Sequence, residues 1–207
     1  RVVPRACEFM DRRCLELVRD EAPDLSEDAG AILLIETDGS RESARSDLAA
    51  ALDVMRDGGA VDVIEAADAR EAEALWDIRR KISPTVQGNF RHRVAEDICV
   101  PRSRLAEMLD AINAGGEKFS IDVACFGHAG DGNIHVQLLP TEAADVPRAL
   151  EAAGDVFRAA VGMGGTLSGE HGIGFAKQDF MSIEVPPAGL ALMRRVKQAF
   201  DPNGILN

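Results

Sequence analysis

Hydrophobic side chains recur at helical spacing in several stretches of the chain. Cys7, Met10, Cys14 and Leu17 follow one another every three to four positions, which predicts an amphipathic helix over residues 4–20 with both cysteines on its buried face. The same spacing returns later in the chain, in stretches that tend to stop at glycine or proline. These predicted helices are residues 48–57, 68–84, 105–116, 146–161 and 188–200.

Short apolar runs bounded by turn residues predict strands. They lie at residues 31–36, 61–65, 95–100, 121–126 and 134–139. The last two runs are joined by only seven residues, 127–133, so an antiparallel pair is the simplest connection. The mixture predicts an α+β fold, an antiparallel sheet with helices mainly on one face, similar to ferredoxin-like modules. No apolar run reaches the roughly 18 residues that a membrane span needs.

The charge balance argues against nucleic acid as a partner. Lys and Arg number 23 and Asp and Glu 35, a net charge of −12, whereas binding to phosphates needs a cationic face. One stretch, residues 78–95, contains no acidic residue and carries Arg79, Arg80, Lys81, Arg91 and Arg93. This cationic stretch is suited to a small anion, or it is the solvated end of a helix.

Four cysteines without a CxxC pair are typical of reduced thiols in a cytosolic protein. The chain starts at Arg1, and neither an apolar leader nor a cleavage site follows it. We therefore expect a soluble piece of a longer protein whose beginning is missing.

Two of the four histidines flank a glycine-rich turn, Gly127-His128-Ala129-Gly130-Asp131-Gly132-Asn133-Ile134-His135. A hairpin at this turn would let His128 and His135 converge, as metal ligands must. The alternative is that the turn is hairpin chemistry alone, with Asp131 or Asn133 as its cap.

A second glycine-rich stretch, residues 164–174, contains Glu170 beside His171, and Lys177 follows it. Neighbouring residues do not easily point the same way, so one of the two would complete a metal site with His128 and His135 while the other transfers a proton. A connector with a surface Glu-His pair is the alternative. The stretch contains neither a GxGxxG nor a GxxxxGK[ST] motif, so it does not have the pattern of a nucleotide-binding loop. Two His and a Glu also form a hydrolytic zinc site, which makes a metal-dependent hydrolase the leading rival enzyme.

Three ordered segments resemble the C-terminal half of FAD-linked D-2-hydroxy-acid dehydrogenases. They are HAGDGNIH at residues 128–135, SGEHGIG at 168–174 and DPNGILN at 201–207, and residues 76–79 and 96–101 also resemble family segments. This is the flavoprotein family of vanillyl-alcohol oxidase type that includes the glycolate oxidase catalytic subunit, D-lactate dehydrogenase and D-2-hydroxyglutarate dehydrogenase.

The resemblance implies a substrate or cap domain over residues 1–185 and a C-terminal helical segment, residues 186–207, that returns to the FAD-binding domain. In such proteins the FAD-binding domain precedes the cap, so this chain is expected to be inactive alone. The implied reaction oxidises a 2-hydroxy acid to a 2-oxo acid by hydride transfer to the flavin. A metal-dependent hydrolase and a non-catalytic interaction module are the alternatives.

The resemblance also implies roles for individual residues. His128, His135 and Glu170 would hold a divalent metal, zinc with manganese or iron as alternatives, and His171 would be the base that removes the proton. Arg79, Arg93 and Asn133 would contact the substrate. Asn207 would contact the flavin. Two positions depart from the family pattern. Ala95 stands where metal-dependent relatives often have lysine, which leaves the identity of the 2-hydroxy acid open, and the chain ends at Asn207, where relatives continue with Pro-Gly-Lys.

Expected partners are the small 2-hydroxy acid, an electron acceptor of unknown identity, and a second copy of the chain or an electron-transfer subunit. The expected location is cytoplasmic, peripheral to the inner membrane in the full-length complex.

Overall fold

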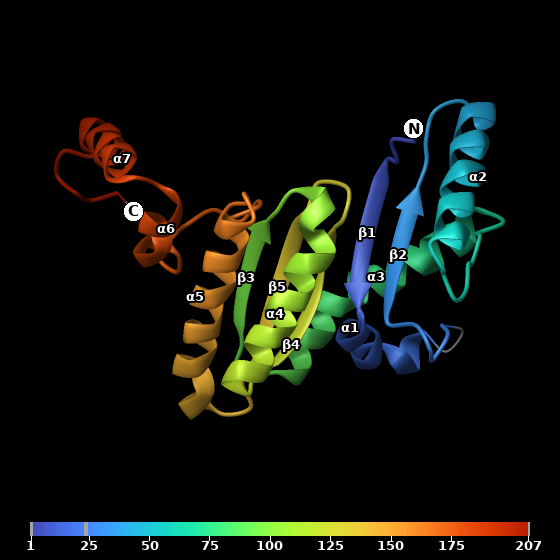
Figure 1. Ribbon diagram of the computed structural model, residues 1–207, viewed down its shortest axis with the longest axis horizontal. Helices are drawn as coiled ribbons and strands as arrows, with labels where there is room; N and C mark the ends of the chain where they lie inside the picture. Colours follow the sequence, from blue (N-terminus) through green and yellow to red (C-terminus); the bar gives the residue numbers. More distant parts are fainter. Residues whose placement is uncertain (1, 23–24, 207) are drawn as a thin grey trace.

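The computed structural model describes residues 2–22 and 25–206, and these fold around one five-stranded sheet of order β2-β1-β4-β5-β3 in which every neighbouring pair is antiparallel (Figure 1). The strands are β1 Ala6–Asp11, β2 Ala31–Glu36, β3 Val94–Cys99, β4 Asp122–His128 and β5 Asn133–Leu139. The predicted α+β fold with an antiparallel sheet is confirmed, and so are the strands predicted at 31–36, 95–100, 121–126 and 134–139, within one or two residues at each end.

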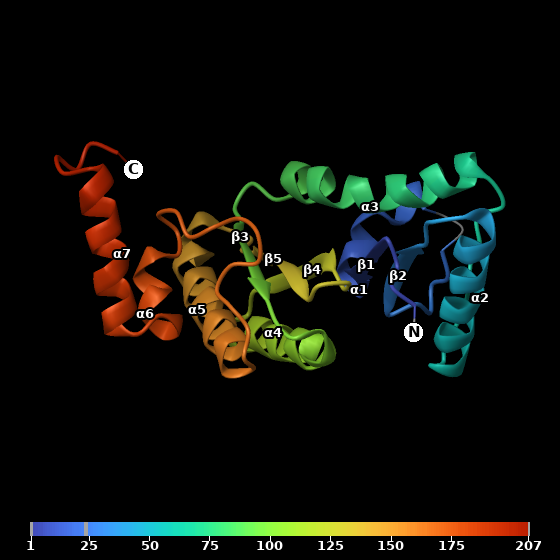
Figure 2. The ribbon, with the colours of Figure 1, turned by 90° about the horizontal axis from the view of Figure 1, so that it is seen from above.

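Helices lie on both sides of the sheet, and the two that bury the most side chains share one side. The helices are α1 Arg12–Leu17, α2 Arg41–Asp57, α3 Ala69–Asn89, α4 Leu105–Phe119, α5 Val146–Gly162, α6 Met181–Glu184 and α7 Pro187–Phe200, and single 3-10 turns lie at Arg19–Glu21, Arg102–Arg104, Ala143–Asp145 and Gln178–Phe180. α4 and α5 cover one face, and α3 runs along the opposite face (Figure 2).

The two faces differ in how apolar they are. On the first face β5 buries Ile134, Val136 and Leu138 against α4 and α5, where Met108 and Phe157 are fully buried. The core on the other face is smaller, because α1 and α3 contribute only a few buried side chains to it. Its buried members are Met10, Cys14, Leu15, Val18, Ile82, Val86, Ala124, Phe126 and Leu139. The rest of this second face, over β5 and β3, is therefore left to polar side chains.

The helix predicted over residues 4–20 is wrong in its first half. Residues 6–11 form β1, and α1 begins only at Arg12. Because β1 pairs with β2 on one side and β4 on the other, three consecutive residues, Glu8, Phe9 and Met10, are buried, and no helical periodicity survives. Cys7 lies half-buried on the strand and Cys14 lies buried in α1, so the expected shared helical face does not exist.

The strand predicted at residues 61–65 is also wrong. Val61 is 69% and Ile64 48% exposed, and within the described part of the chain no strand lies beside them to pair with. Three helices run further than predicted. α2 begins at Arg41, before the predicted start at residue 48. α3 continues through Pro84 because Ile82 and Val86 on either side of it are buried, and α4 continues through Gly116 because that glycine packs against β4, where a Cβ would lie 2.6 Å from Val123 Cγ2.

The C-terminal helix α7 confirms the helix predicted at residues 188–200 and contacts α6. It lies beyond α5, away from the sheet (Figure 1), and exposes Leu192, Met193, Val196 and Phe200. The division of the chain at residue 185 stays a prediction. Across residues 2–22 and 25–206, every helix is too short or too polar to cross a membrane.

Asp11 joins α1 to the sheet. One carboxylate oxygen accepts from the N–H of Cys14 at 2.8 Å and caps α1, and the other accepts from the N–H of Cys125 in β4 at 2.6 Å. Replacement by alanine leaves both N–H groups without an acceptor, so Asp11→Ala should lower the free energy of unfolding by about 2–4 kcal/mol. The matched control is Ser40→Ala, which removes the exposed cap of α2 and should cost about 1 kcal/mol. Urea unfolding measures both, and equal losses would contradict the double role of Asp11.

Candidate metal centre and its neighbouring histidine

The candidate site lies on the polar part of the second face, where strand register aligns side chains in rows. Residues that face each other across antiparallel strands project to the same side of the sheet. Phe126, His135 and Asp97 form one such row across β4, β5 and β3. The adjacent row contains Glu8 and His128, which pair across β1 and β4, and continues to Asn133.

The turn between β4 and β5 brings the two histidines into adjacent rows. Gly132 has a φ of +88°, and a Cβ there would lie 2.0 Å from the carbonyl oxygen of Val100, so a side chain at this position does not fit. Asp131 accepts from the N–H of Asn133 at 3.0 Å, which is the capping contact expected of a hairpin turn. The structure therefore has both the capped hairpin turn and the two histidines close together, which the sequence offered as alternatives.

The loop that carries Glu170 and His171 crosses the open edge of β3. Thr166 pairs with Cys99 of that strand, and Leu167 is fully buried. The loop then passes over Asn133 so closely that a Cβ at Gly169 would lie 1.5 Å from Asn133 Nδ2. A glycine at position 169 thus lets the next two residues lie above the histidine rows.

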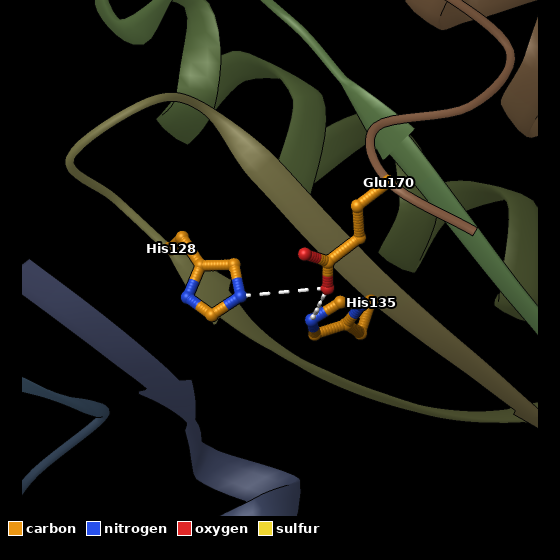
Figure 3. A group of neighbouring side chains, drawn as sticks. All are labelled: His128, His135 and Glu170. Atoms are coloured by element: carbon orange, nitrogen blue, oxygen red, sulfur yellow. Dashed lines mark ion pairs between the residues drawn. The ribbon is translucent and has the colours of Figure 1, made fainter. Parts of the chain in front are cut away.

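His128, His135 and Glu170 converge, as the sequence predicts (Figure 3). Each offers one ligand atom, and these atoms all lie within 4.8 Å of one another. Oε1 of Glu170 is 3.3 Å from Nε2 of His135 and 3.6 Å from Nε2 of His128. His135 is 7% exposed and His128 about one-third exposed, so the group is closed toward the sheet and open toward solvent.

The environment shifts the pKa values of the two imidazoles in opposite directions. Burial, together with the nearby charge of His128, lowers the pKa of His135 to about 4, so this ring is neutral at pH 7, the form that binds metal. Burial would also lower the pKa of His128, but its Nδ1 lies 2.6 Å from Oε1 of the buried Glu8, and this contact raises the pKa overall. Glu8 therefore holds Nδ1 and directs Nε2 toward Glu170, an arrangement typical of metal-binding histidines.

The donor set fits a divalent metal. Two imidazoles and one carboxylate suit zinc and also iron or manganese, and three protein ligands leave further positions for other oxygen donors. Nδ1 of His135 is buried without a hydrogen-bond partner among the described residues, so its only accessible nitrogen is the one that faces Glu170.

His171 lies beside this group. Its side chain is 58% exposed, and its ring stacks on that of His135 with centroids 5.2 Å apart and planes 11° apart. Nε2 of His171 is 3.9 Å from Oε1 of Glu170, and Nδ1 is 3.6 Å from Oδ1 of Asp97. A solvent-facing imidazole thus lies next to three residues that could hold a metal, as expected of a residue that moves protons.

The other residues predicted for the site are placed in different ways. Arg79, on α3, lies over the Phe126 ring and donates through Nε to Oε2 of Glu8 at 3.0 Å, and its Nη2 forms an ion pair with the same oxygen at 3.0 Å. Asn133 is buried, and both polar atoms of its amide lack a partner among the described residues. Arg93 is exposed just before β3, four residues or roughly 13 Å along the chain from Asp97, and it is not brought to the histidines. Asn207 lies outside the described residues. The roles expected of these four residues stay predictions.

Three residues of the site escaped prediction. Glu8 was hidden by the erroneous helix at residues 4–20, although a lone carboxylate among apolar neighbours was a signal. Asp97 lies in the middle of a short, otherwise largely apolar strand, and that position also indicates a function for a charged residue. Lys177 follows the second glycine-rich stretch at a distance of six residues from His171, and spacing alone does not show that it is buried.

Comparison with known proteins gives consistent matches. The sequence profile of the family "FAD linked oxidases, C-terminal domain" matches residues 1–207. The chain is 36% identical to the glycolate oxidase subunit GlcD of Bacillus subtilis, over all of this chain and 45% of that protein. It is 30% identical to a D-lactate dehydrogenase of Anaerostipes hadrus, over all of this chain and 46% of that protein. With the mitochondrial D-2-hydroxyglutarate dehydrogenase of Bos taurus the identity is 33%, over 98% of this chain and 38% of that protein.

A similar fold occurs in a 4-ethylphenol oxidase from Gulosibacter chungangensis, whose structure matches 97% of this chain and 46% of its own with a TM-score of 0.58 and 14% identity. The chain spans less than half the length of each of these relatives.

The depressed pKa of His135 predicts a pH dependence of folding in the metal-free chain. The unfolded chain binds this proton below about pH 6.5, but the folded chain does so only near pH 4. This proton therefore has no effect on the free energy of unfolding above about pH 6.5 and lowers it as the pH falls toward 4, with a loss of about 2–3 kcal/mol at pH 4.5.

Urea unfolding with a chelator present, at about pH 7 and about pH 4.5, measures this loss. His135→Gln removes the titrating ring and should lose that much less, whereas His128, whose raised pKa acts in the opposite sense, is common to both proteins. The same loss in both proteins would contradict the assignment.

Proposed function

Because the chain belongs to the family of FAD linked oxidase C-terminal domains, we propose that it is the substrate-binding domain of a flavin-dependent 2-hydroxy-acid dehydrogenase. The observation that carries this proposal is the convergence of His128, His135 and Glu170 beside the exposed His171. A 2-hydroxy acid offers a hydroxyl and a carboxylate oxygen on adjacent carbons, which is a pair suited to the free positions of a three-ligand metal.

The residues of this chain have distinct tasks in that proposal. A metal held by His128, His135 and Glu170 would polarise the substrate hydroxyl, and the flavin would supply the acceptor for the hydride that leaves as the 2-oxo acid forms. His171 removes the hydroxyl proton, since its ring is exposed and lies next to Glu170.

Arg79 is the proposed anchor for the substrate carboxylate. Its contacts with Glu8 use Nε and Nη2, so other N–H groups of the guanidinium are free of Glu8 and can serve a substrate carboxylate. Glu8 then acts on both sides, because it orients Arg79 through one carboxylate oxygen and His128 through the other. Asn133, whose amide has no hydrogen-bond partner within residues 2–22 and 25–206, is a second proposed substrate contact. Arg93 and Asn207 keep their proposed roles as contacts of substrate and flavin.

The finer assignments follow from the donor set and from the names of the relatives. We propose zinc as the metal, with manganese or iron as alternatives, and glycolate, D-lactate or D-2-hydroxyglutarate as the substrate. The proposed partners are a second copy of the chain or an electron-transfer subunit, in line with the description of one relative as a subunit of glycolate oxidase. Four free cysteines favour a reducing, cytoplasmic location, with the full-length complex peripheral to the inner membrane.

The test uses the full-length protein mixed anaerobically with each of the three acids, with the loss of oxidised-flavin absorbance as the readout. His171→Gln should lower the rate constant of flavin reduction by about 10²–10⁴-fold, because proton removal by a positioned base contributes that much. A chelator should also lower it, and zinc should restore it. The control is Lys118→Met, a surface change on α4 that should leave the rate unchanged.

Reduction of the flavin at the wild-type rate in His171→Gln would contradict the assignment of the base. Failure of all three acids to reduce the flavin, together with metal-dependent hydrolysis of an ester by the flavin-free protein, would replace the proposal with the hydrolase.

A further inference from the structure

Lys177 is a buried cation for which the proposed chemistry has no use. It is 3% exposed, and its ammonium group makes three hydrogen bonds. They reach Oδ1 of Asp97 at 2.7 Å, the carbonyl oxygen of Asp97 at 2.6 Å and the carbonyl oxygen of Leu167 at 2.9 Å. All three N–H donors of the lysine are therefore satisfied. A residue whose charge is buried and fully bonded is held in one position.

Asp97 connects this lysine to the loop above it. The carboxylate is fully buried, and Oδ2 accepts from two consecutive backbone N–H groups, of Glu170 at 2.6 Å and of His171 at 3.0 Å. Oδ1 accepts from Lys177 and, at 3.3 Å, from the hydroxyl of Ser168. Burial alone would raise the pKa of Asp97, but these donors hold it well below its usual range, so the group stays a carboxylate.

The loop itself supplies little to hold Glu170 and His171 in place. Both side chains are more than half exposed, and glycines lie directly before and after the pair, at positions 169 and 172. Glycine flanks leave a backbone with many accessible conformations. Two adjacent N–H groups bonded to one oxygen fix the course of the backbone at this pair, and hence the directions in which the two side chains leave it.

We propose that Lys177 and Asp97 are positioning residues that hold Glu170 over the two metal-binding histidines and His171 against the ring of His135. Lys177 acts through Asp97, to which it donates; its ammonium group also lies 3.5 Å from Oε2 of the buried Glu96. Neither Lys177 nor Asp97 contacts the three candidate ligand atoms. The expected effect on metal binding rests on the proposed metal site, but the position of the loop can be measured without a metal.

The first measurement is residue-resolved amide hydrogen exchange of the full-length, metal-free protein. In Lys177→Met, which keeps the length of the side chain and removes its donors, the amides of Glu170 and His171 should exchange at least about tenfold faster. The amides of Ile134 and Val136 in β5 should keep their wild-type rates, which separates loosening of the loop from global unfolding. The matched control is Lys118→Met, which removes the lysine of an exposed Lys–Asp pair and should change neither set.

The second measurement is the titration of Co²⁺ followed by its visible absorption. Lys177→Met should bind Co²⁺ about 10–100-fold more weakly, as expected when an outer-shell partner is lost, and its spectrum should approach that of Glu170→Gln, in which one ligand is absent. A merely structural loss of stability would not convert one spectrum into the other.

Unchanged exchange at Glu170 and His171 in Lys177→Met would overturn the inference, and so would a wild-type Co²⁺ spectrum and affinity. If wild type binds no Co²⁺, the proposed metal site fails, and the exchange rates alone decide the inference. Should Lys177→Met not fold, Ser168→Ala tests the same network more gently, because the Ser168 hydroxyl donates to Asp97 and accepts from the N–H of Gly172 at 2.8 Å. That variant should exchange faster at Gly172 and His171, and wild-type rates at both would count against the network.

Discussion

The antiparallel register that runs from β1 through β4 and β5 to β3 is the constraint on which the whole site depends. It places Glu8, His128, His135 and Asp97 on one face of the sheet, in two adjacent rows. Because side chains alternate between faces, a slip of one residue between β4 and β5 would send one of the two histidines into the core under α4 and α5. The apolar side chains of β5 exclude that alternative, since Ile134 and Val136 are fully buried on the other face. The packing of the core and the convergence of the imidazoles are thus two consequences of one register.

The site has two parts with different mechanical properties. The histidines lie on strands, which are rigid, and Glu8 orients one of them through a 2.6 Å contact. Glu170 and His171 lie on a glycine-rich loop, and their position depends on the buried pair of Lys177 and Asp97. In the proposed site this loop supplies Glu170 as a metal ligand and His171 as the base, and the buried pair beneath it holds the backbone of the loop in one geometry. This division is in keeping with sites whose loop residues are positioned by a rigid scaffold.

Much of the site could be predicted from the sequence because most of its polar residues lie in two short segments. Two histidines around a Gly-Asp-Gly-Asn turn and a Glu-His pair in a second glycine-rich stretch indicated four of its residues, and the short link between two apolar runs indicated the hairpin. The erroneous elements share one cause, which is pairing between segments distant in the sequence. Residues 6–11 became a strand because β2 and β4 flank them, whereas residues 61–65 carry a strand-like pattern and find no neighbour. Glu8 and Lys177 act through contacts 120 and 80 residues away, which local spacing does not reveal.

The most direct test of this account is the anomalous X-ray scattering of crystals of the full-length protein grown with zinc and measured at the zinc absorption edge. The account predicts a single strong peak on this domain, between Nε2 of His128, Nε2 of His135 and the carboxylate of Glu170, with the Glu8 carboxylate still on Nδ1 of His128. A strong zinc peak elsewhere on the domain, with these three side chains turned apart and no peak between them, would contradict it.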